Sequence, residues 1–280
     1  MRAIGSKRID KLTARDLDAL YRKMLDAGLS RSRVRQTHAV LSRALTQAVK
    51  WQWLSQNVAR FASPPSVQRT VVTAPSPEQL RDVLLEASGR SAQMAALFAL
   101  LAFTGARRGE IVALRWSDYD SRAGILTISK SVGYTAKNGI FVKSTKTNMA
   151  RRIETSTTMN TIVESQVSVL KKNADRGFDL ASDPYLFYGD PGGFGPVHPD
   201  TPTKFFRIVC DQLGLPLHLH QLRHFVGTEL IAAGHDPRTV AGRLGHDPAM
   251  LLRTYAHVVQ ARDRAASEYL ETLIDFPRND

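Results

Sequence analysis

The sequence predicts a mainly α-helical protein with a small antiparallel β-sheet, an α+β fold divided between two domains. Apolar residues recur at helical spacing along most of the 280-residue chain, and three short strand-like stretches interrupt this pattern near the middle. A chain of this length commonly forms two domains. A proline-rich stretch at residues 62–77 has no helical periodicity. We therefore predict domains at 1–66 and 77–280, joined by a linker at 67–76.

The first domain is predicted to consist of helices. Thr13 can cap a helix that ends at Gly28, and Ser30 can cap a second helix that runs to Trp51. Each helix has an apolar side, made by Leu17, Leu20, Tyr21 and Leu25 in the first helix and by Val34, Leu41, Leu45 and Val49 in the second.

Positive charge is concentrated in this first domain. Residues 1–70 hold 14 Lys and Arg against 4 Asp and Glu, whereas residues 71–280 hold 24 against 22. A segment this basic attracts a polyanion, usually nucleic acid, although a solvated basic face is the alternative. The charge total favours a face that contacts DNA phosphates. Its candidate residues lie beside the apolar stripe of the second helix and are Arg31, Arg33, Arg35, His38 and Arg43.

The second domain is predicted to begin at Pro77. Helices are expected at 77–86, 91–103 and 107–116, strands at 124–130, 139–145 and 150–156, and helices again from about residue 160. The glycine-rich segment 189–195 lacks the Gly-Lys-Ser/Thr sequence of a phosphate-binding P-loop, so we expect a surface loop there.

Targeting signals are absent from the sequence pattern. The longest apolar run, residues 94–103, is far shorter than the roughly 20 residues that span a bilayer, so it predicts a buried helix. No secretory signal opens the chain, and Cys210 is the single cysteine. A cytoplasmic protein is expected.

Three clusters of residues could carry chemistry. TGARRGEIVALRW places Arg107 at the start of a helix, where backbone amides favour an anion. HLHQLRHF places His220 and Arg223 on one helical face, with His224 beside them. Its three histidines also suggest a metal, but His218 and His220 would diverge on a helix and no Cys or carboxylate is close to complete a zinc site.

The third cluster follows a repeated Gly-His-Asp-Pro sequence at residues 234–237 and 245–248. Asp and Pro at these positions are explained by helix capping, which leaves His235 and His246 unexplained. Nine residues after His246 comes Tyr255.

Together these motifs resemble the tyrosine recombinases, the phage integrase family. Six positions occur in the family's order and approximate spacing, namely Arg107, Lys146, His220, Arg223, His246 and Tyr255. The basic helical segment also resembles the family's core-binding, SAM-like domain, and the remainder its catalytic domain. The family's further N-terminal helix has no counterpart before residue 4, so we expect a truncated or small version of that domain.

The resemblance implies a role for each of these residues. Arg107 and Arg223 would hold the oxygens of a DNA phosphate with paired hydrogen bonds, and Tyr255 would attack the phosphorus to form a 3′-phosphotyrosyl bond. Lys146 would protonate the leaving 5′ oxygen, His220 would exchange the proton of the tyrosine, and His246 would donate a hydrogen bond to the phosphate. Glu110 and Asp118 would support the arginine. One ester replaces another, so we expect no cofactor, metal or ATP.

The expected function is therefore site-specific DNA recombination by a phage or prophage integrase. The implied partners are double-stranded attachment sites, a homotetramer on DNA formed from a monomer in solution, and an accessory DNA-bending protein, all at the nucleoid of a bacterial host. A Xer-type or transposon recombinase shares the chemistry, and a catalytically silent DNA-binding protein of the same fold is the alternative outside enzymes. The apolar side of the last helix would dock either on a neighbouring subunit or on its own domain.

Overall fold

The computed structural model describes residues 4–67, 73–144, 150–256, 258 and 263–273. Contacts divide the chain into a unit at Met1–Val71 and a larger unit at Val72–Asp280. Each unit has its own hydrophobic core. In the described part of the chain, the helices are all too short or too polar to cross a membrane.

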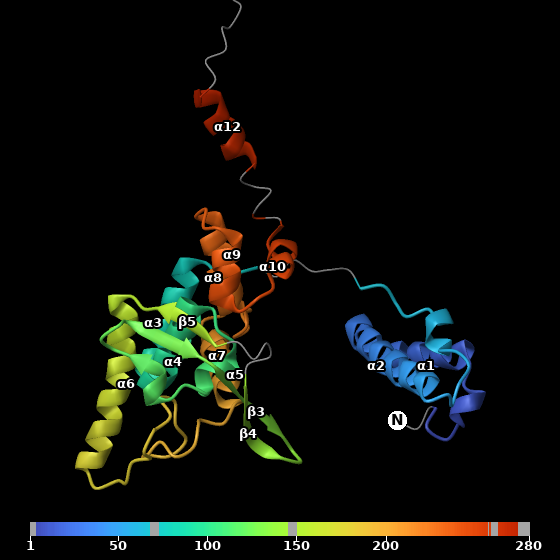
Figure 1. Cartoon of the computed structure of the whole chain (residues 1–280), viewed down its shortest axis with the longest axis horizontal. Coiled ribbons are helices and arrows are strands. Elements are labelled where there is room, and N and C mark those ends of the chain that lie inside the picture. Colours follow the sequence, from blue (N-terminus) through green and yellow to red (C-terminus); the bar gives the residue numbers. More distant parts are fainter. Residues whose placement is uncertain (1–3, 68–72, 145–149, 257, 259–262, 274–280) are drawn as a thin grey trace, which may run out of the picture. The chain divides into compact units, whose positions relative to one another are not determined.

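The first unit is built on two helices, α1 (Ala14–Asp26) and α2 (Arg31–Lys50) (Figure 1). As predicted, Thr13 caps α1 and Ser30 caps α2, because each hydroxyl accepts a backbone N–H of the first turn. Short 3₁₀ helices η1 (Ile9–Lys11) and η2 (Val58–Phe61) flank the pair.

The buried face of α1 differs in one position from the predicted one. Leu25 is 37% exposed, and Met24 lies in the core in its place. Leu17, Leu20 and Met24 are spaced by three and four residues, which keeps them on one face of a helix, whereas Leu25 falls beyond its edge.

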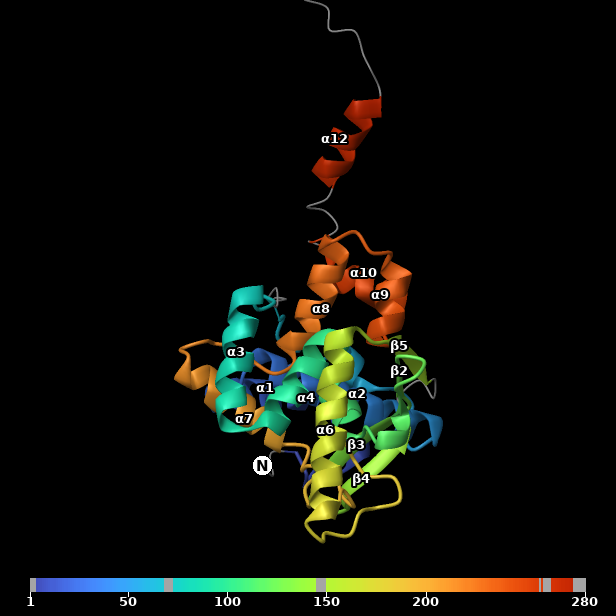
Figure 2. The same ribbon diagram turned by 90° about the vertical axis from the view of Figure 1, so that its left-hand side faces the viewer.

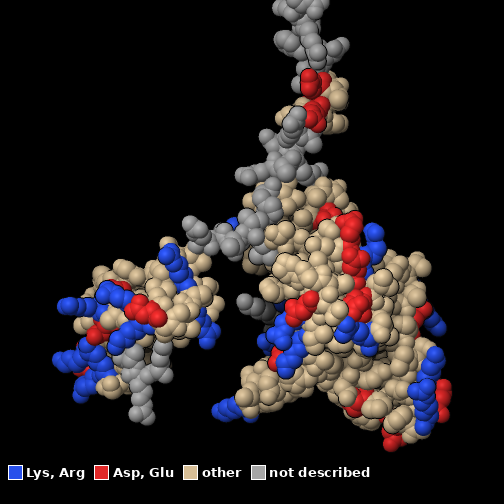
Figure 3. Space-filling view, turned by 180° about the vertical axis from the view of Figure 1, so that it is seen from behind, with Lys and Arg blue, Asp and Glu red and all other residues tan. Residues whose placement is uncertain are grey.

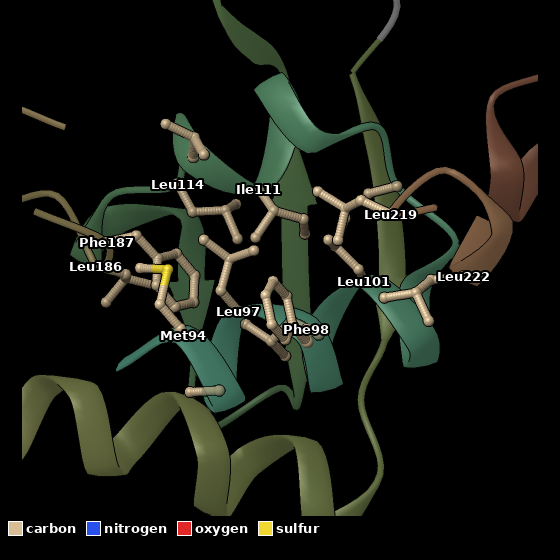
Figure 4. Packing of buried hydrophobic residues seen from close by; sticks show 14 of the residues in the cluster. Met94, Leu97, Phe98, Leu101, Ile111, Leu114, Leu186, Phe187, Leu219 and Leu222 are labelled. Carbon is tan, nitrogen blue, oxygen red and sulfur yellow. The ribbon is translucent and has the colours of Figure 1, made fainter. Parts of the chain in front are cut away.

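The second unit is organised around the buried helix α4 (Ala92–Thr104), which is apolar on all sides. It contacts α3 (Pro77–Arg90), α5 (Arg108–Val112), α6 (Thr157–Asp175), α7 (Thr201–Gln212) and α8 (Gln221–Ala232). Figure 4 shows Leu97, Phe98 and Leu101 of α4 packed among apolar side chains of the surrounding elements. The prediction of a buried helix here is confirmed.

A second small core lies between α8 and the helices that follow it. α8, α9 (Pro237–Leu244) and α10 (Pro248–Thr254) lie side by side around this core (Figures 1 and 2). After them, Val258 packs against this core, and α12 (Asp263–Leu273) exposes Leu270 and Leu273. The docking of the tail helix remains a prediction.

The strands form two sheets instead of the single one predicted. β1 (Tyr119–Asp120), β2 (Ile125–Ile128) and β5 (Arg151–Glu154) make an antiparallel sheet in the order β1-β2-β5. β3 (Lys130–Thr135) and β4 (Gly139–Ser144) form a separate hairpin that projects from the body of the unit (Figure 1). Neither β1 nor β3 corresponds to a predicted strand.

The predicted helix at 107–116 is too long. α5 ends at Val112, and a 3₁₀ helix, η3 (Trp116–Asp118), follows. The carbonyl of Leu114 accepts the N–H of Leu186 (2.9 Å), and the N–H of Trp116 donates to the carbonyl of Pro184 (2.9 Å). Because these backbone groups are hydrogen-bonded to residues 184–186, they are not available for helical hydrogen bonds, and α5 cannot continue through them.

Candidate active site

A rigid turn between α4 and α5 carries Arg107. Gly105 ends α4 in the left-handed conformation (φ 61°), and a Cβ at this position would overlap the side chain of Leu244. The hydroxyl of Thr104 accepts the N–H of Ala106 (3.1 Å). Only glycine therefore fits, and the turn fixes Arg107 as the N-cap residue of α5.

Glu110 holds Arg107 in place. Its carboxylate accepts the backbone N–H of Arg107 (2.8 Å) and Nη1 of the same residue (2.9 Å). Glu110 is only 2% exposed. Burial opposes its ionisation, but hydrogen bonds from Arg151 and Arg107 outweigh this effect and lower the pKa of Glu110. The predicted support of Arg107 by Glu110 is present in the structure.

Asp118 does not share this role. Its carboxylate accepts the backbone N–H of Arg115 (2.9 Å) at the start of η3. The prediction that Asp118 supports Arg107 is wrong, because the shortened α5 places Asp118 in another turn.

Arg223, on α8, is bound to the turn that carries Arg107. Its Nη1 donates to the carbonyl of Gly105 (2.6 Å), and the residue is 3% exposed. Burial lowers the pKa of Arg223 to about 10, and the charge of Arg107 adds to this effect, so the guanidinium is still charged at neutral pH. Its Nη2 is buried and has no hydrogen-bond partner among the described residues.

The two Gly-His-Asp-Pro repeats have different surroundings. Asp236 and Asp247 both cap helices, α9 and α10, as predicted. His235 is exposed, whereas Nδ1 of His246 is buried without a partner in the described part of the chain. Burial, followed by Arg223 and Arg107, lowers the pKa of His246 to about 4, so its ring is neutral at pH 7.

Gly245 links His246 to Arg107. It ends α9 in the left-handed conformation (φ 65°), and its carbonyl accepts Nη2 of Arg107 (3.3 Å). The turn before α10 therefore lies against the turn before α5.

Tyr255 lies at the end of α10 with its ring buried against α8. It is 1% exposed, its hydroxyl is 3.5 Å from Nδ1 of His224, and a Cβ at Gly227 would overlap the phenol. Burial raises the pKa of Tyr255. The rings of His220 and His224 meet edge to face at 5.2 Å, and burial lowers the pKa of both.

The structure thus brings five of the six predicted catalytic residues into one cluster, which we call the arginine–histidine cluster: Arg107, His220, Arg223, His246 and Tyr255. Lys146 and His257 lie outside the described residues. A cavity of about 310 Å³ opens beside the cluster, lined by His218, His220 and Arg223 together with Arg108 and Thr203. Among the described residues, no three His, Cys, Asp or Glu side chains are grouped to hold a metal ion.

Sequence reasoning missed two residues of this region. Arg151 bonds Glu110, and Gly227 gives the Tyr255 ring its space. Arg151 could have been found, because strand alternation puts it on the same face as the apolar Ile153. Gly227 gave no signal, since its partner comes from another helix.

The family model of the phage integrase family matches residues 75–262. The chain belongs to this family. It is similar to the ICEBs1 integrase of Bacillus subtilis (strain 168), with 25% identity over 95% of this chain and 72% of the relative. The match confirms the predicted family and enzyme class, the tyrosine site-specific recombinases.

Solved structures of tyrosine recombinases share the fold. The Tn1549 transposon integrase in complex with circular intermediate DNA superposes with a TM-score of 0.79 at 20% identity, covering 96% of this chain and 90% of that one. The lambda integrase tetramer bound to a Holliday junction gives a TM-score of 0.63 at 15% identity, covering 89% and 67%. The predicted fold class is therefore confirmed.

Proposed function

We propose that the protein cleaves and rejoins DNA at specific sites, as a phage or prophage integrase, through a 3′-phosphotyrosyl intermediate on Tyr255. One observation carries this proposal for the site. Two buried nitrogens, Nη2 of Arg223 and Nδ1 of His246, have no hydrogen-bond partner among the described residues, and both belong to the cluster that contains Arg107. Buried polar groups are normally paired, and a DNA phosphate would pair these two once the movement that releases Tyr255 has also uncovered them.

The chemistry follows from the residue types. Arg107 and Arg223 would bind the non-bridging oxygens, whose negative charge increases in the transition state. Neutral His246 would donate one N–H to the same phosphate. The phenolic oxygen of Tyr255 attacks phosphorus and gives up its proton to His220, while the 5′ oxygen leaves with a proton from Lys146. A phosphodiester bond is exchanged for a phosphotyrosyl bond, so the step uses no ATP.

The position of Tyr255 implies a movement before cleavage. A phenol that is 1% exposed cannot reach a phosphate on a DNA duplex. The end of α10 must therefore shift away from Gly227 when DNA binds. The new position would separate the hydroxyl from His224, to which it lies at the long distance of 3.5 Å.

The two histidines of the repeat give a first prediction. Replacing His246 with Ala removes a donor to the phosphate, and we expect strand cleavage to fall about 100-fold. His235→Ala changes an exposed side chain that precedes a helix cap, so cleavage should stay at the wild-type rate. Single-turnover cleavage of a labelled duplex measures both, and equal losses for the two variants would contradict the assignment.

The first unit supplies a basic face for the DNA backbone. Arg31, Arg33, Arg35 and Arg43 are exposed along α2, and Figure 3 shows Lys and Arg side chains spread over this unit. His38 differs from the prediction, because its Nδ1 is 2.8 Å from the hydroxyl of Tyr21 and its ring packs on that tyrosine. We therefore propose the four arginines, without His38, as the phosphate contacts.

Salt dependence of DNA binding tests this face. Each phosphate contact contributes about 0.9 to the slope of log affinity against log salt concentration. A triple variant in which Arg31, Arg33 and Arg35 are all replaced by Gln should reduce the magnitude of that slope by up to about 2.7, if each arginine makes one contact. Arg22→Gln, on the exposed surface of α1, is the matched control and should leave the slope unchanged. Equal slopes for the triple variant and the wild type would show that these arginines do not contact the DNA phosphates.

A nicked suicide duplex that carries the core site tests the function itself. Loss of the short fragment beyond the nick traps the covalent intermediate, so a recombinase gives a protein–DNA adduct on a denaturing gel. Duplex binding without any adduct would instead indicate a silent DNA-binding protein. A Xer-type or transposon recombinase would also give the adduct. Sequencing the DNA on both sides of the gene distinguishes them, because an attachment site next to the gene indicates a prophage integrase.

Assembly is the remaining part of the proposal. The lambda integrase structure contains a tetramer on a Holliday junction, and we propose the same assembly here, formed from monomers on two duplexes. A DNA-bending protein would assist it at the bacterial nucleoid. The exposed Leu270 and Leu273 of α12 would dock on the neighbouring subunit.

A further inference from the structure

A second arginine, Arg151, is built into the support of Arg107. It lies on β5 next to the exposed Arg152, but strand alternation turns it to the inner face, where its side chain is 12% exposed. Nη2 donates to Oε2 of Glu110 (2.6 Å), and Nε donates to the carbonyl of Arg243 (3.1 Å). The guanidinium also packs closely against Gly245. Arg151 is thus fixed at three points.

The two carboxylate oxygens of Glu110 accept hydrogen bonds from both arginines. Oε2 accepts Nη2 of Arg151 and the backbone N–H of Arg107, whereas Oε1 accepts Nη1 of Arg107. Because Arg151 occupies Oε2, the side chain of Arg107 reaches only one oxygen of the carboxylate. The Arg107 side chain is 38% exposed, three times as much as Arg151. The remaining donors of Arg107 are therefore available to a ligand.

The buried negative charge of Glu110 explains why two arginines bind it. A buried carboxylate is stable only when a positive charge neutralises it. Glu110 has two ion-pair partners in the described part of the chain, Arg151 and Arg107. If Arg151 were lost, Arg107 alone would have to neutralise Glu110, and a guanidinium meets a carboxylate best by a two-oxygen fork. The same fork would then be withdrawn from a phosphate.

We propose that Arg151 is a positioning residue for DNA cleavage, which neutralises Glu110 so that the guanidinium of Arg107 stays free to bind the phosphate. The proposal rests on the function proposed above. Arg151 acts through Glu110 and does not itself touch DNA. Its bond to the Arg243 carbonyl and its packing on Gly245 keep its guanidinium on Glu110.

A double-mutant cycle tests the proposal on the suicide duplex. Arg151→Met should lower the rate of adduct formation about 10- to 100-fold, as expected when a residue that orients an active-site group is removed. Arg151→Lys should lose less, since it keeps the charge on Glu110. Arg152→Gln, the exposed neighbour on the same strand, is the matched control and should cleave like the wild type.

The decisive comparison is made in the Glu110→Gln background. Without the carboxylate there is no charge for Arg151 to neutralise, so adding Arg151→Met should change the rate little, and the double variant should cleave faster than Arg151→Met alone. A residue that only stabilises the fold would lower the rate by the same factor in both backgrounds. That additive result would overturn the proposal.

Two further readouts keep the outcomes separate. Melting temperatures show whether Arg151→Met folds, and if it does not, the comparison of Glu110→Gln with the double variant still decides, because neither of these two proteins contains the buried Glu110 carboxylate. If the wild type forms no adduct, the proposed function fails. If wild type, Arg152→Gln and Arg151→Met all form it equally fast, only the role of Arg151 fails.

Discussion

Tyr255→Phe should bind the DNA duplex as tightly as the wild type and form no covalent adduct. The substitution removes only the hydroxyl, which the proposal makes the sole nucleophile, so no other group can form the phosphotyrosyl bond. The ring keeps its buried position against Gly227, and the hydroxyl gives up only the 3.5 Å contact with His224. A contact this long contributes little, so the free energy of unfolding should change by less than about 1 kcal/mol.

The control for this variant is a second buried tyrosine. Tyr185 is also buried, and Arg115 stacks on its ring at 4.0 Å, but it does not belong to the arginine–histidine cluster. Tyr185→Phe should form the adduct at the wild-type rate. The denaturing gel compares both variants, and adduct formation by Tyr255→Phe would mean that another residue attacks the DNA.

Arg223→Lys should lower the cleavage rate by about 100- to 1,000-fold, the usual effect of losing one donor to transition-state charge. Arg223 uses Nη1 for the Gly105 carbonyl and leaves Nη2 for the phosphate. The single amine of lysine cannot reproduce this fork. Burial also favours the neutral form of a lysine at this position, which would weaken its attraction to the phosphate.

Single-turnover rates at saturating protein separate this loss from weaker binding. Arg115→Lys is the matched control, because Arg115 also bonds a backbone carbonyl, that of Asp183 (2.6 Å), yet lies apart from the cluster. Cleavage should be unchanged in Arg115→Lys. A loss for Arg223→Lys no larger than for Arg115→Lys would remove Arg223 from the reaction.

Local signals in the sequence were sufficient for most helices. Thr13, Ser30, Asp236 and Asp247 cap helices where their side chains predicted it, because a cap depends only on the next few residues. β3 could not be predicted in the same way. Its Gly133 is unfavourable for a strand, but the ring of Phe141 on β4 covers it, and that contact depends on the pairing of the two strands.

In the site, too, the sequence indicated individual residues but not the contacts between residues that are far apart in the chain. The resemblance supplied the six candidate residues, and the structure places five of them together. Arg151 and Glu110 are 41 positions apart in the chain, so nothing in the local sequence indicated that they form an ion pair. The end of α5 also depends on residues far away in the chain. The backbone just after α5, at residues 114–116, forms hydrogen bonds with residues 184–186.

The most direct test of the account is to identify the residue that carries the DNA in the adduct. Nuclease and trypsin digestion of the trapped complex should give the peptide of residues 254–262 with a nucleotide attached, and fragmentation by mass spectrometry should place a 3′-phosphate on the oxygen of Tyr255. A nucleotide on a serine or on another tyrosine, or one joined through its 5′-phosphate, would contradict the proposed mechanism.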